Sequence, residues 1–454
     1  MAQENMTEGF MSTEDLLEVM QYENENDRTK IKQYFTHPQD MDLNKKTIVF
    51  STPSETGTSF FRIFEPMRSL WKAFPDEANY IYTENMQPNH VKIADVVIMH
   101  RCGNLHSHFL SVARMWPKTE KRPYVIHDAD DNEFNLPNSH PMKTLWMESG
   151  KDKMSLQSIK HSDCITTTTP KLKETFLKFN DDVNIFPNMF DWDLPQWNYN
   201  KEDTRKDMLG EWFPTDDKII IGWAGLTSHF EDIKRMAPIM KAIHDTYPNT
   251  YFVIAGMALK DTQVEIHEDE DGNKSFEEKE IENEEETYKG RIESLYKGID
   301  PKRLKIFDAL PLENYGKFYS LFDINLAYIE HNAFASCKSE IKVVEGLHYG
   351  CIPVFSNYGG YKTMCNMLPS NVDTKHFAID MTSPQPWINA ISHHIDNYEE
   401  AQKRTAMFKK WSDGTYDINA FAEERLNFYI NRSEEFQEDW YNNNIAQYLD
   451  YEGT

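Results

Sequence analysis

The sequence has 454 residues, of which 39% are hydrophobic and 13% aromatic, and its formal net charge is -26. This length exceeds what one hydrophobic core usually organises, so we expect two domains with appendages, and the composition excludes a disordered chain. The acidic balance argues against non-specific coating of nucleic acid, which depends on Lys and Arg. Long apolar stretches and a basic, apolar leader are both absent from the sequence, so we expect a cytoplasmic protein and no membrane partner.

The charge and the cysteines are unevenly spread. Residues 265–286 are strongly acidic, whereas residues 101–178 are locally net positive, so a polyanionic acceptor met by one face stays open. The five cysteines are scattered without a C-x-x-C spacing, which predicts free thiols and neither a disulfide framework nor a zinc site.

The first half of the chain predicts alternating strands and helices. Residues 1–45 form a polar extension with one amphipathic stretch at 12–22, and a Rossmann-like domain is expected over 46–190. Its β-branched runs predict parallel strands joined by helical crossovers, including a helix from 60 to 74 and one ending at Met115. The expected strands are Thr47–Ser51, Asp95–His100, Tyr124–His127 and Asp163–Thr167.

The second half repeats this alternation. A connector rich in Trp, Pro and Asp covers 191–217, and a second Rossmann-like domain is expected over 218–384, interrupted by an acidic insertion at 263–288 that we interpret as a solvated hairpin or loose insertion. Residues 385–454 are helical in pattern and are expected to cross back to the first domain. The predicted fold class is α/β, with two doubly wound halves and a helical C-terminal tail.

The strongest motif runs from Lys338 to Gly360, with the sequence KSEIKVVEGLHYGCIPVFSNYGG. A polar loop opens a helix whose N-terminal amides suit a diphosphate. Glu345 lies almost two turns inside that helix and can present a carboxylate to vicinal hydroxyls such as those of a ribose. The block is followed by a short buried strand and two glycines that allow close backbone approach to a ligand.

This block resembles the GT-B glycosyltransferases, particularly the family-4-like group with its K-S-x-x-K-x-x-E…G-x-P-V pattern. The resemblance implies two Rossmann-like domains facing across a cleft, a nucleotide sugar as cosubstrate, most commonly a UDP-sugar, and no other cofactor. It also implies Glu345 as the ribose ligand, with Lys338, Ser339 and Lys342 near the donor nucleotide or its phosphates. An ordinary helix-turn-strand with surface lysines is the bland alternative.

A second block, from Ile220 to Asp232, predicts a strand followed by a Gly-containing turn. It resembles the family's loop that meets the donor diphosphate, which makes Gly225, Ser228 and His229 candidate donor ligands. Ser228 and Glu231 fit a capping box for the next helix, so Ser228 could serve only as a cap. The alternative for His229 is an ordinary surface histidine.

Two blocks of the first half complete the candidate site. The turn after the first strand offers Gly57, Ser59 and Arg62, since a guanidinium can fork onto phosphate. Acids follow an inner strand at Asp130 and Asp131, where α/β sheets hold ligands. We interpret them as acceptor-side residues with one base between them, or as purely structural groups, and we place His100 and Arg101 at the same rim. We expect no metal, because GT-B enzymes generally use cations of the protein and helix dipoles instead.

The departing nucleoside diphosphate must be stabilised electrostatically, and Lys342, Lys338 and Arg62 are the candidate cations. Family-4-like enzymes retain configuration, and many carry a second glutamate where this sequence has Cys337. That departure leaves the sugar contact and the stereochemistry open.

Several acceptors fit the sequence. The locally basic stretch and an amino-acid composition that resembles that of large-phage proteins favour a phage enzyme that glycosylates 5-hydroxymethylcytosine in double-stranded DNA. Such an enzyme would have to flip the base out of the duplex. The alternative is a cytoplasmic transferase of surface polysaccharide or glycan synthesis. A different class is a non-enzymatic binding protein on a GT-B scaffold. An oxidoreductase is disfavoured because no strand precedes G-x-G-x-x-G. The oligomeric state is not specified by the sequence.

Overall fold

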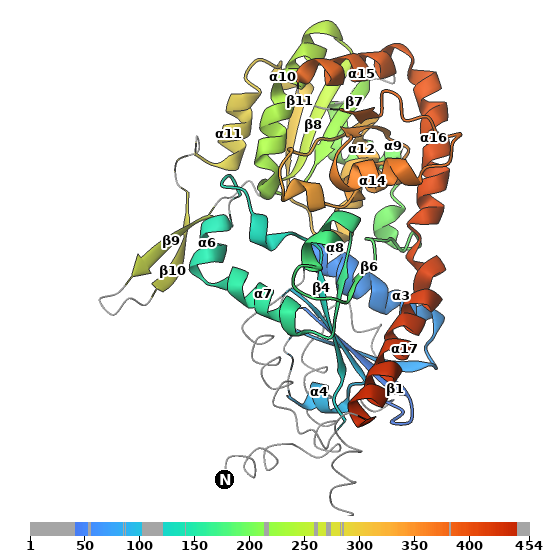
Figure 1. The fold of residues 1–454 in the computed structure, drawn as a ribbon. Helices are drawn as coiled ribbons and strands as arrows, with labels where there is room; N and C mark the ends of the chain where they lie inside the picture. The colour runs from blue at the N-terminus through green and yellow to red at the C-terminus, as the bar shows by residue number, and fades with distance from the viewer. Residues whose placement is uncertain are drawn as a thin grey trace, which may run out of the picture. The chain divides into compact units, whose positions relative to one another are not determined.

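The computed structural model describes residues 41–52, 56–84, 86, 88–101, 121–140, 142–212, 218–257, 262–268, 274–281, 283, 286–380 and 383–442 (Figure 1). The amphipathic stretch predicted at 12–22 and the helix predicted to end at Met115 lie outside these residues. The chain divides into two compact units. The first comprises the described residues of 1–133, 150–191 and 417–454, and the second comprises those of 134–149 and 192–416.

The first unit contains a six-stranded sheet in the order β2-β1-β3-β4-β5-β6, in which every pairing is parallel. Its strands are β1 (Lys46–Ser51), β2 (Ala78–Thr83), β3 (Val96–His100), β4 (Tyr124–Ala129), β5 (Cys164–Thr167) and β6 (Val183–Ile185). Its helices are α2 (Gly57–Ser59), the π-helical η4 (Phe60–Phe64), α3 (Glu65–Ala73), α4 (Pro88–Ile93), α7 (Lys151–His161), α8 (Pro170–Phe176), η12 (Ile418–Phe421) and α17 (Ala422–Trp440), and a short turn, η5 (Glu133–Asn135), follows β4.

The second unit contains a parallel sheet in the order β11-β8-β7-β12-β13-β14. Its strands are β7 (Ile219–Ala224), β8 (Thr250–Met257), β11 (Leu304–Asp308), β12 (Ile324–Ala327), β13 (Ile352–Ser356) and β14 (Ala378–Ile379). Its helices are α6 (Lys143–Glu148), α9 (Lys201–Leu209), α10 (Phe230–Thr246), α11 (Tyr288–Leu295), α12 (Gly316–Leu321), α13 (Ile341–His348), α14 (Gly359–Met367), α15 (Pro384–Asp396) and α16 (Tyr398–Thr415). Short 3-10 turns are η6 (Pro195–Trp197), η7 (Gly210–Trp212), η8 (Thr227–His229), η9 (Pro301–Arg303), η10 (Leu312–Asn314) and η11 (Ala335–Cys337).

The predicted α/β fold with two doubly wound halves and C-terminal helices is confirmed. The predicted acidic insertion contains an antiparallel hairpin of β9 (Thr262–Glu268) and β10 (Lys274–Glu280). The predicted linker 191–217 carries the helix α9, and the boundary expected at 385 falls inside the second unit, which includes α15 and α16. Among the described residues, no helix combines the length and apolar character needed to cross a bilayer.

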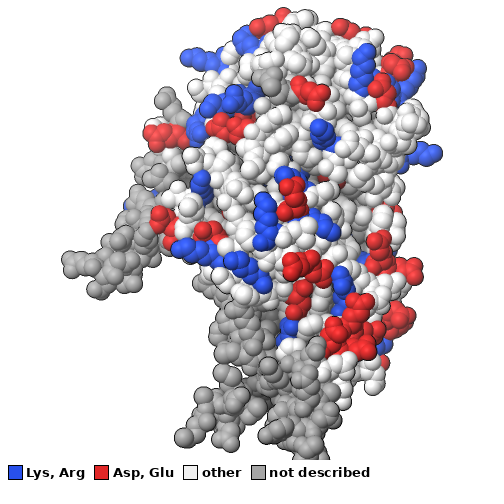
Figure 2. Space-filling view, viewed as in Figure 1, with Lys and Arg blue, Asp and Glu red and all other residues white. Residues whose placement is uncertain are grey.

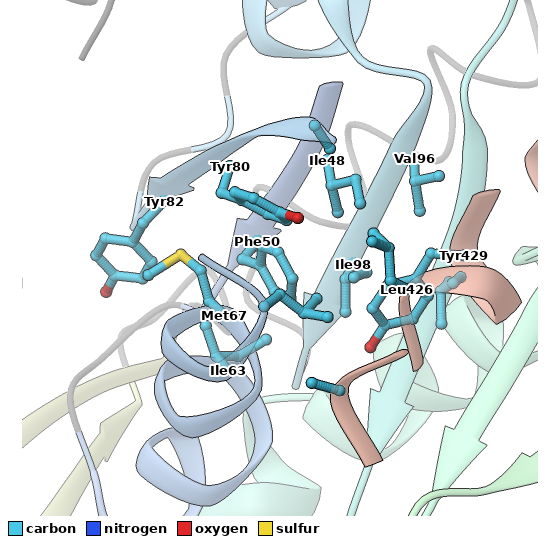
Figure 3. Packing of buried hydrophobic residues seen from close by; sticks show 14 of the residues in the cluster. Ile48, Phe50, Ile63, Met67, Tyr80, Tyr82, Val96, Ile98, Leu426 and Tyr429 are labelled. Carbon is cyan, nitrogen blue, oxygen red and sulfur yellow. The ribbon is translucent and has the colours of Figure 1, made fainter. Parts of the chain in front are cut away.

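The C-terminal helix α17 completes the hydrophobic core of the first unit. Leu426 and Tyr429 pack against β1 and β3 together with residues of α3 (Figure 3). The Tyr429 ring meets the ring of Phe50 edge-on at 6.2 Å, and the Ser433 hydroxyl donates to the carbonyl of Asp95 at 3.2 Å. Helix α17 therefore buries the apolar face of a sheet whose first strand, β1, begins at Lys46, far from α17 in the sequence.

Gly222 on β7 lies against the core of the second unit. A Cβ atom built there would come within 2.0 Å of the ring of Phe322, which is fully buried. We expect Gly222→Ala to lower the free energy of unfolding by about 1–3 kcal/mol or more through overpacking. Gly414→Ala is the matched control, because its added Cβ would meet nothing within 4 Å beyond its chain neighbours and the backbone of its own helix, and alanine favours the α16 helix by about 0.5–1 kcal/mol. Urea unfolding curves in which both variants behave alike would contradict the packing at β7.

Candidate functional site

Two glycines meet at the carboxyl ends of β7 and β8, where Gly225 begins the turn after β7 and Gly256 lies near the end of β8. The Gly225 amide donates to the carbonyl of Ala255 at 3.0 Å, and Gly256 adopts a φ of +90° against the backbone of Gly225. A Cβ atom at Gly225 would lie 2.7 Å from Nζ of Lys342 and 2.8 Å from the ring of Trp223. Only glycine leaves room there for the lysine side chain to reach the turn.

Lys342 is a buried cation on α13. Its side chain crosses the Trp223 ring, with Nζ 4.6 Å from the ring centroid, and the residue is only 8% exposed. Nζ has no hydrogen-bond partner among the described residues. Burial lowers the pKa of Lys342 to about 8, and Asp232 and Glu345 oppose this shift while Lys338 adds to it. A buried ammonium without a hydrogen-bond partner, at the end of a parallel sheet, is suited to bind an anionic group.

Glu345 lies one turn further along α13 and is 2% exposed. Burial raises the pKa of its carboxyl group to about 8, although the neighbouring Tyr319 hydroxyl and Lys342 both act to lower it. At neutral pH the group therefore carries a proton in this structure and can donate as well as accept a hydrogen bond. The sequence predicted its position in the block but not its protonation state, which depends on the surrounding packing.

The prediction that Ser228 caps the next helix is wrong. A 3-10 turn, η8, precedes α10, so His229 takes the N-cap position and no side chain caps the helix. His229 instead pairs through Nδ1 with Oδ2 of Asp232 at 2.8 Å, and the other carboxylate oxygen accepts from the amide of Glu330 at 3.0 Å. Asp232 thus joins the start of α10 to the loop after β12.

The loop before α13 is packed against the glycine pair that follows β13. The helix begins at Ile341, so Lys338 and Ser339 lie in the loop, two to three residues before it. Nζ of Lys338 lies 4.5 Å from the centroid of the Phe334 ring. The Gly360 amide donates to the carbonyl of Lys338 at 3.2 Å, and a Cβ atom at Gly360 would come within 2.4 Å of that oxygen. Close backbone packing therefore holds the loop in place.

In the first unit, Arg62 lies in a buried ion pair. Its Nε and Nη2 atoms donate to the two carboxylate oxygens of Asp128 at 2.8 and 2.6 Å, and Nη1 donates to Phe186 and Asn188. Burial alone would raise the pKa of Asp128, but the guanidinium outweighs it and holds that pKa below its ordinary value. The proposed contact of Arg62 with phosphate stays a prediction, because in this structure its donors face these three residues.

The turn before Arg62 is ordered by a capping box. The hydroxyl of Thr56 accepts from the amide of Ser59, while the Ser59 hydroxyl accepts from the amide of Thr56 at 2.6 Å. Gly57 is the first residue of this short helix, and the space around its Cα is open. The roles of Gly57 and Ser59 toward an anion remain predictions.

The structure brings the other predicted acceptor-side residues together at the ends of β3 and β4. Nε2 of the buried His100 lies 3.4 Å from Oδ1 of Asp130, and Nη2 of Arg101 lies 3.7 Å from that oxygen and 3.6 Å from Oδ2 of Asp131. Arg101 has a φ of 54°, a strained conformation for a residue with a side chain. Within the described residues, no group of three or more His, Cys, Asp or Glu side chains is arranged to hold a metal ion.

Sequence reasoning left Glu133 out of this cluster. Its carboxylate accepts from the Ser155 hydroxyl at 3.0 Å and lies 3.8 Å from Nε of Arg101. Burial raises the pKa of Glu133 to about 7, Arg101 opposes the shift, and Asp131 adds to it. The run of acidic residues after β4 could have predicted the position of Glu133, because residues that directly follow parallel strands lie at the same edge of the sheet.

The Arg62 ion pair makes a stability prediction. Arg62→Met leaves the Asp128 carboxylate buried without its partner, and we expect the free energy of unfolding to fall by about 3–5 kcal/mol. Lys171→Met provides the control, since its pair with Glu174 is exposed and should contribute less than about 1 kcal/mol. Chemical unfolding measured for both variants tests this, and an equally small loss for both would contradict the structural role of Arg62.

No protein-family model and no curated protein matches this sequence. Solved structures do match. A sucrose-phosphate synthase from Thermosynechococcus elongatus superposes with a TM-score of 0.55 at 12% identity, over 85% of this chain and 99% of that chain. The chain has the GT-B fold. HepE from Anabaena, solved in complex with UDP-glucose, gives a TM-score of 0.54 at 12% identity, over 84% of this chain and 99% of that chain.

A third GT-B structure is WaaG, a glycosyltransferase involved in lipopolysaccharide biosynthesis. It gives a TM-score of 0.51 at 11% identity, over 84% of this chain and 99% of that chain. The GT-B fold thus covers most of the chain in each of these comparisons, and the predicted fold of the two Rossmann-like halves agrees with them.

Proposed function

We propose that this chain is a glycosyltransferase that uses a nucleotide sugar and binds its diphosphate at Lys342. The observation that carries this proposal is the buried ammonium, which lies beside the Gly225 turn and has no hydrogen-bond partner among the described residues. A buried ammonium whose hydrogen-bond donors are unsatisfied costs folding free energy, and an anionic ligand would offset that cost. A diphosphate at the carboxyl end of a parallel sheet satisfies both the charge and the position.

Glu345 is the proposed ribose ligand. Its carboxyl group lies on the same helix as Lys342, one turn further into the interior, and can donate one hydrogen bond while accepting another from vicinal hydroxyls. Gly225, Ser228, Lys338 and Ser339 belong to the loops at the ends of β7 and β12, and we assign them to the donor as well. His229 belongs to this group and is treated below.

The proposed chemistry is transfer with retention of configuration, in which cations of the chain stabilise the leaving nucleoside diphosphate. Lys342 supplies the positive charge, and removal of such a preorganised group typically costs about 100- to 1,000-fold in rate. In the first unit, the cluster of Asp130, Asp131, His100 and Arg101 is the proposed acceptor-side site. Its carboxylates and imidazole can orient a hydroxyl by accepting its proton in a hydrogen bond.

A saccharide acceptor is the reading that the comparisons favour. WaaG acts in lipopolysaccharide biosynthesis and HepE was solved with UDP-glucose, which supports a UDP-sugar donor and an acceptor from glycan synthesis. The finer prediction of 5-hydroxymethylcytosine in phage DNA rests on the locally basic stretch and on the resemblance in composition to large-phage proteins. On the face drawn in Figure 2, Lys and Arg alternate with Asp and Glu, and the described residues form no continuous basic band there.

Transfer assays separate these acceptors. The full chain is incubated with a UDP-, GDP- or dTDP-sugar as donor. The acceptors are oligosaccharides, hydroxymethylcytosine DNA and unmodified DNA, and the masses of the products are measured by mass spectrometry. We expect a sugar-sized mass gain on a saccharide with at least one donor, abolished in Lys342→Met. A gain confined to hydroxymethylated DNA would establish the DNA acceptor instead. Donor binding without turnover on any acceptor would favour a non-enzymatic binding protein.

A further inference from the structure

His229 and Asp232 form a hydrogen-bonded pair beside the proposed diphosphate site. The imidazole Nδ1 lies 2.8 Å from Oδ2 of Asp232. The centroid of the imidazole ring lies 6.3 Å from that of Trp223, and Nζ of Lys342 lies over the same Trp223 ring. The contact to Asp232 is the one hydrogen bond that the His229 ring makes among the described residues. Its Nε2 atom is therefore available to a ligand.

The geometry decides which nitrogen of the ring carries a proton. Nδ1 faces a carboxylate oxygen, which can only accept, so Nδ1 must be the donor. Burial lowers the pKa of His229 to about 4, Lys342 and Lys338 lower it further, and Asp232 opposes them. The ring is therefore neutral at physiological pH and Nε2 presents a lone pair. Such a nitrogen repels a phosphate oxygen and accepts from a hydroxyl group.

We infer that Asp232 is a positioning residue that holds His229 as a neutral acceptor for a hydroxyl of the transferred sugar. This inference rests on the proposed function, and it assigns the diphosphate and the sugar of the donor to two neighbouring side chains. Lys342 donates to the diphosphate, while His229 accepts from the adjoining sugar. Asp232 also accepts the amide of Glu330, which ties the orientation of the pair to the loop after β12.

Nitrogen-15 NMR of the full chain, labelled at histidine, tests the tautomer directly. The signals of His229 are identified by their loss in His229→Gln. We expect the pattern of a ring protonated at Nδ1, unchanged between about pH 6 and pH 8. Asp232→Asn keeps an oxygen for the Glu330 amide but can donate to Nδ1, so we expect the Nε2-protonated form to appear. An imidazolium, or an Nε2-protonated ring in the wild-type protein, would overturn the inference.

Calorimetric titration with UDP and with UDP-glucose tests the ligand. We expect His229→Ala to weaken binding of UDP-glucose by about 3- to 10-fold, the worth of one hydrogen bond, and to leave UDP within about twofold. The affinity of Asp232→Asn for UDP-glucose should lie between those of the wild type and His229→Ala. Asp245→Asn is the matched control, because it alters the His244 and Asp245 pair on the exposed face of the same helix.

The outcomes of this titration separate two failures. An equal loss of affinity for UDP and UDP-glucose in His229→Ala would place the contact on the nucleotide and overturn the inference alone. Absence of binding by the wild-type protein to either probe would count against the proposed use of a UDP-sugar, and against this inference with it.

Discussion

Lys342→Met should lower the rate of sugar transfer by about 100- to 1,000-fold while making the unliganded protein more stable. The rate falls because the leaving diphosphate loses its buried cation. The stability rises because methionine fills the same channel along Trp223 without a charge, and a lysine pKa lowered from 10.5 to about 8 corresponds to a cost of about 3 kcal/mol at neutral pH. Single-turnover kinetics and urea unfolding measure the two effects.

The control for these two effects is Lys410→Met, because Lys410 is an exposed lysine on α16. This variant should change neither the transfer rate nor the free energy of unfolding. Affinity for UDP gives a further check. Because the ammonium loses its proton as the pH rises through about 8, wild-type affinity should fall over that range, and the affinity of Lys342→Met should not follow it. A variant that is both inactive and less stable would show that Lys342 is a structural residue.

Glu345→Gln should raise the free energy of unfolding at about pH 8 and change its dependence on pH. Burial raises the pKa of this carboxyl from 4.5 to about 8, so the folded protein binds the extra proton between these values. The stability contribution is full below the unfolded pKa and is lost as the pH rises toward the folded one. We expect a loss on the order of a few kcal/mol in the wild type over that window, and a flatter profile in the variant.

Thermal or urea unfolding at several pH values between about 5 and 8 measures this slope. Glu399→Gln, on the exposed face of α16, is the matched control and should keep the wild-type profile. If Glu345→Gln followed the wild-type curve, the carboxyl would be ionised in the folded protein, and its proposed role as a proton-bearing ribose ligand would fail.

Much of the fold could be predicted from local sequence patterns. The β-branched runs that became β1, β7 and β13 have strong strand preference, and the alternation with helical stretches leads to parallel sheets with crossovers. The block around Glu345 could be recognised because its loop, helix and strand are contiguous in sequence. The Lys342 position followed from the same block.

What could not be predicted depends on contacts between distant residues. The ion pair of Arg62 with Asp128, 66 residues away, could not be predicted from the local motif, whereas the predicted contact of Arg62 with an anion stays a prediction. Ser228 was predicted to cap a helix, yet a 3-10 turn moved the helix start to the next residue. The placement of 134–149 with the second unit likewise depends on packing that no local pattern records.

We propose that the second unit binds a nucleotide sugar at Lys342 and Glu345. Calorimetric titration of the full chain with UDP-, GDP- and dTDP-sugars tests it most directly. We expect saturable binding of at least one of them, with an affinity lowered by about 10-fold or more in Lys342→Met through loss of one charge-assisted contact. Absence of binding to every nucleotide sugar, or equal binding by the wild type and Lys342→Met, would contradict it.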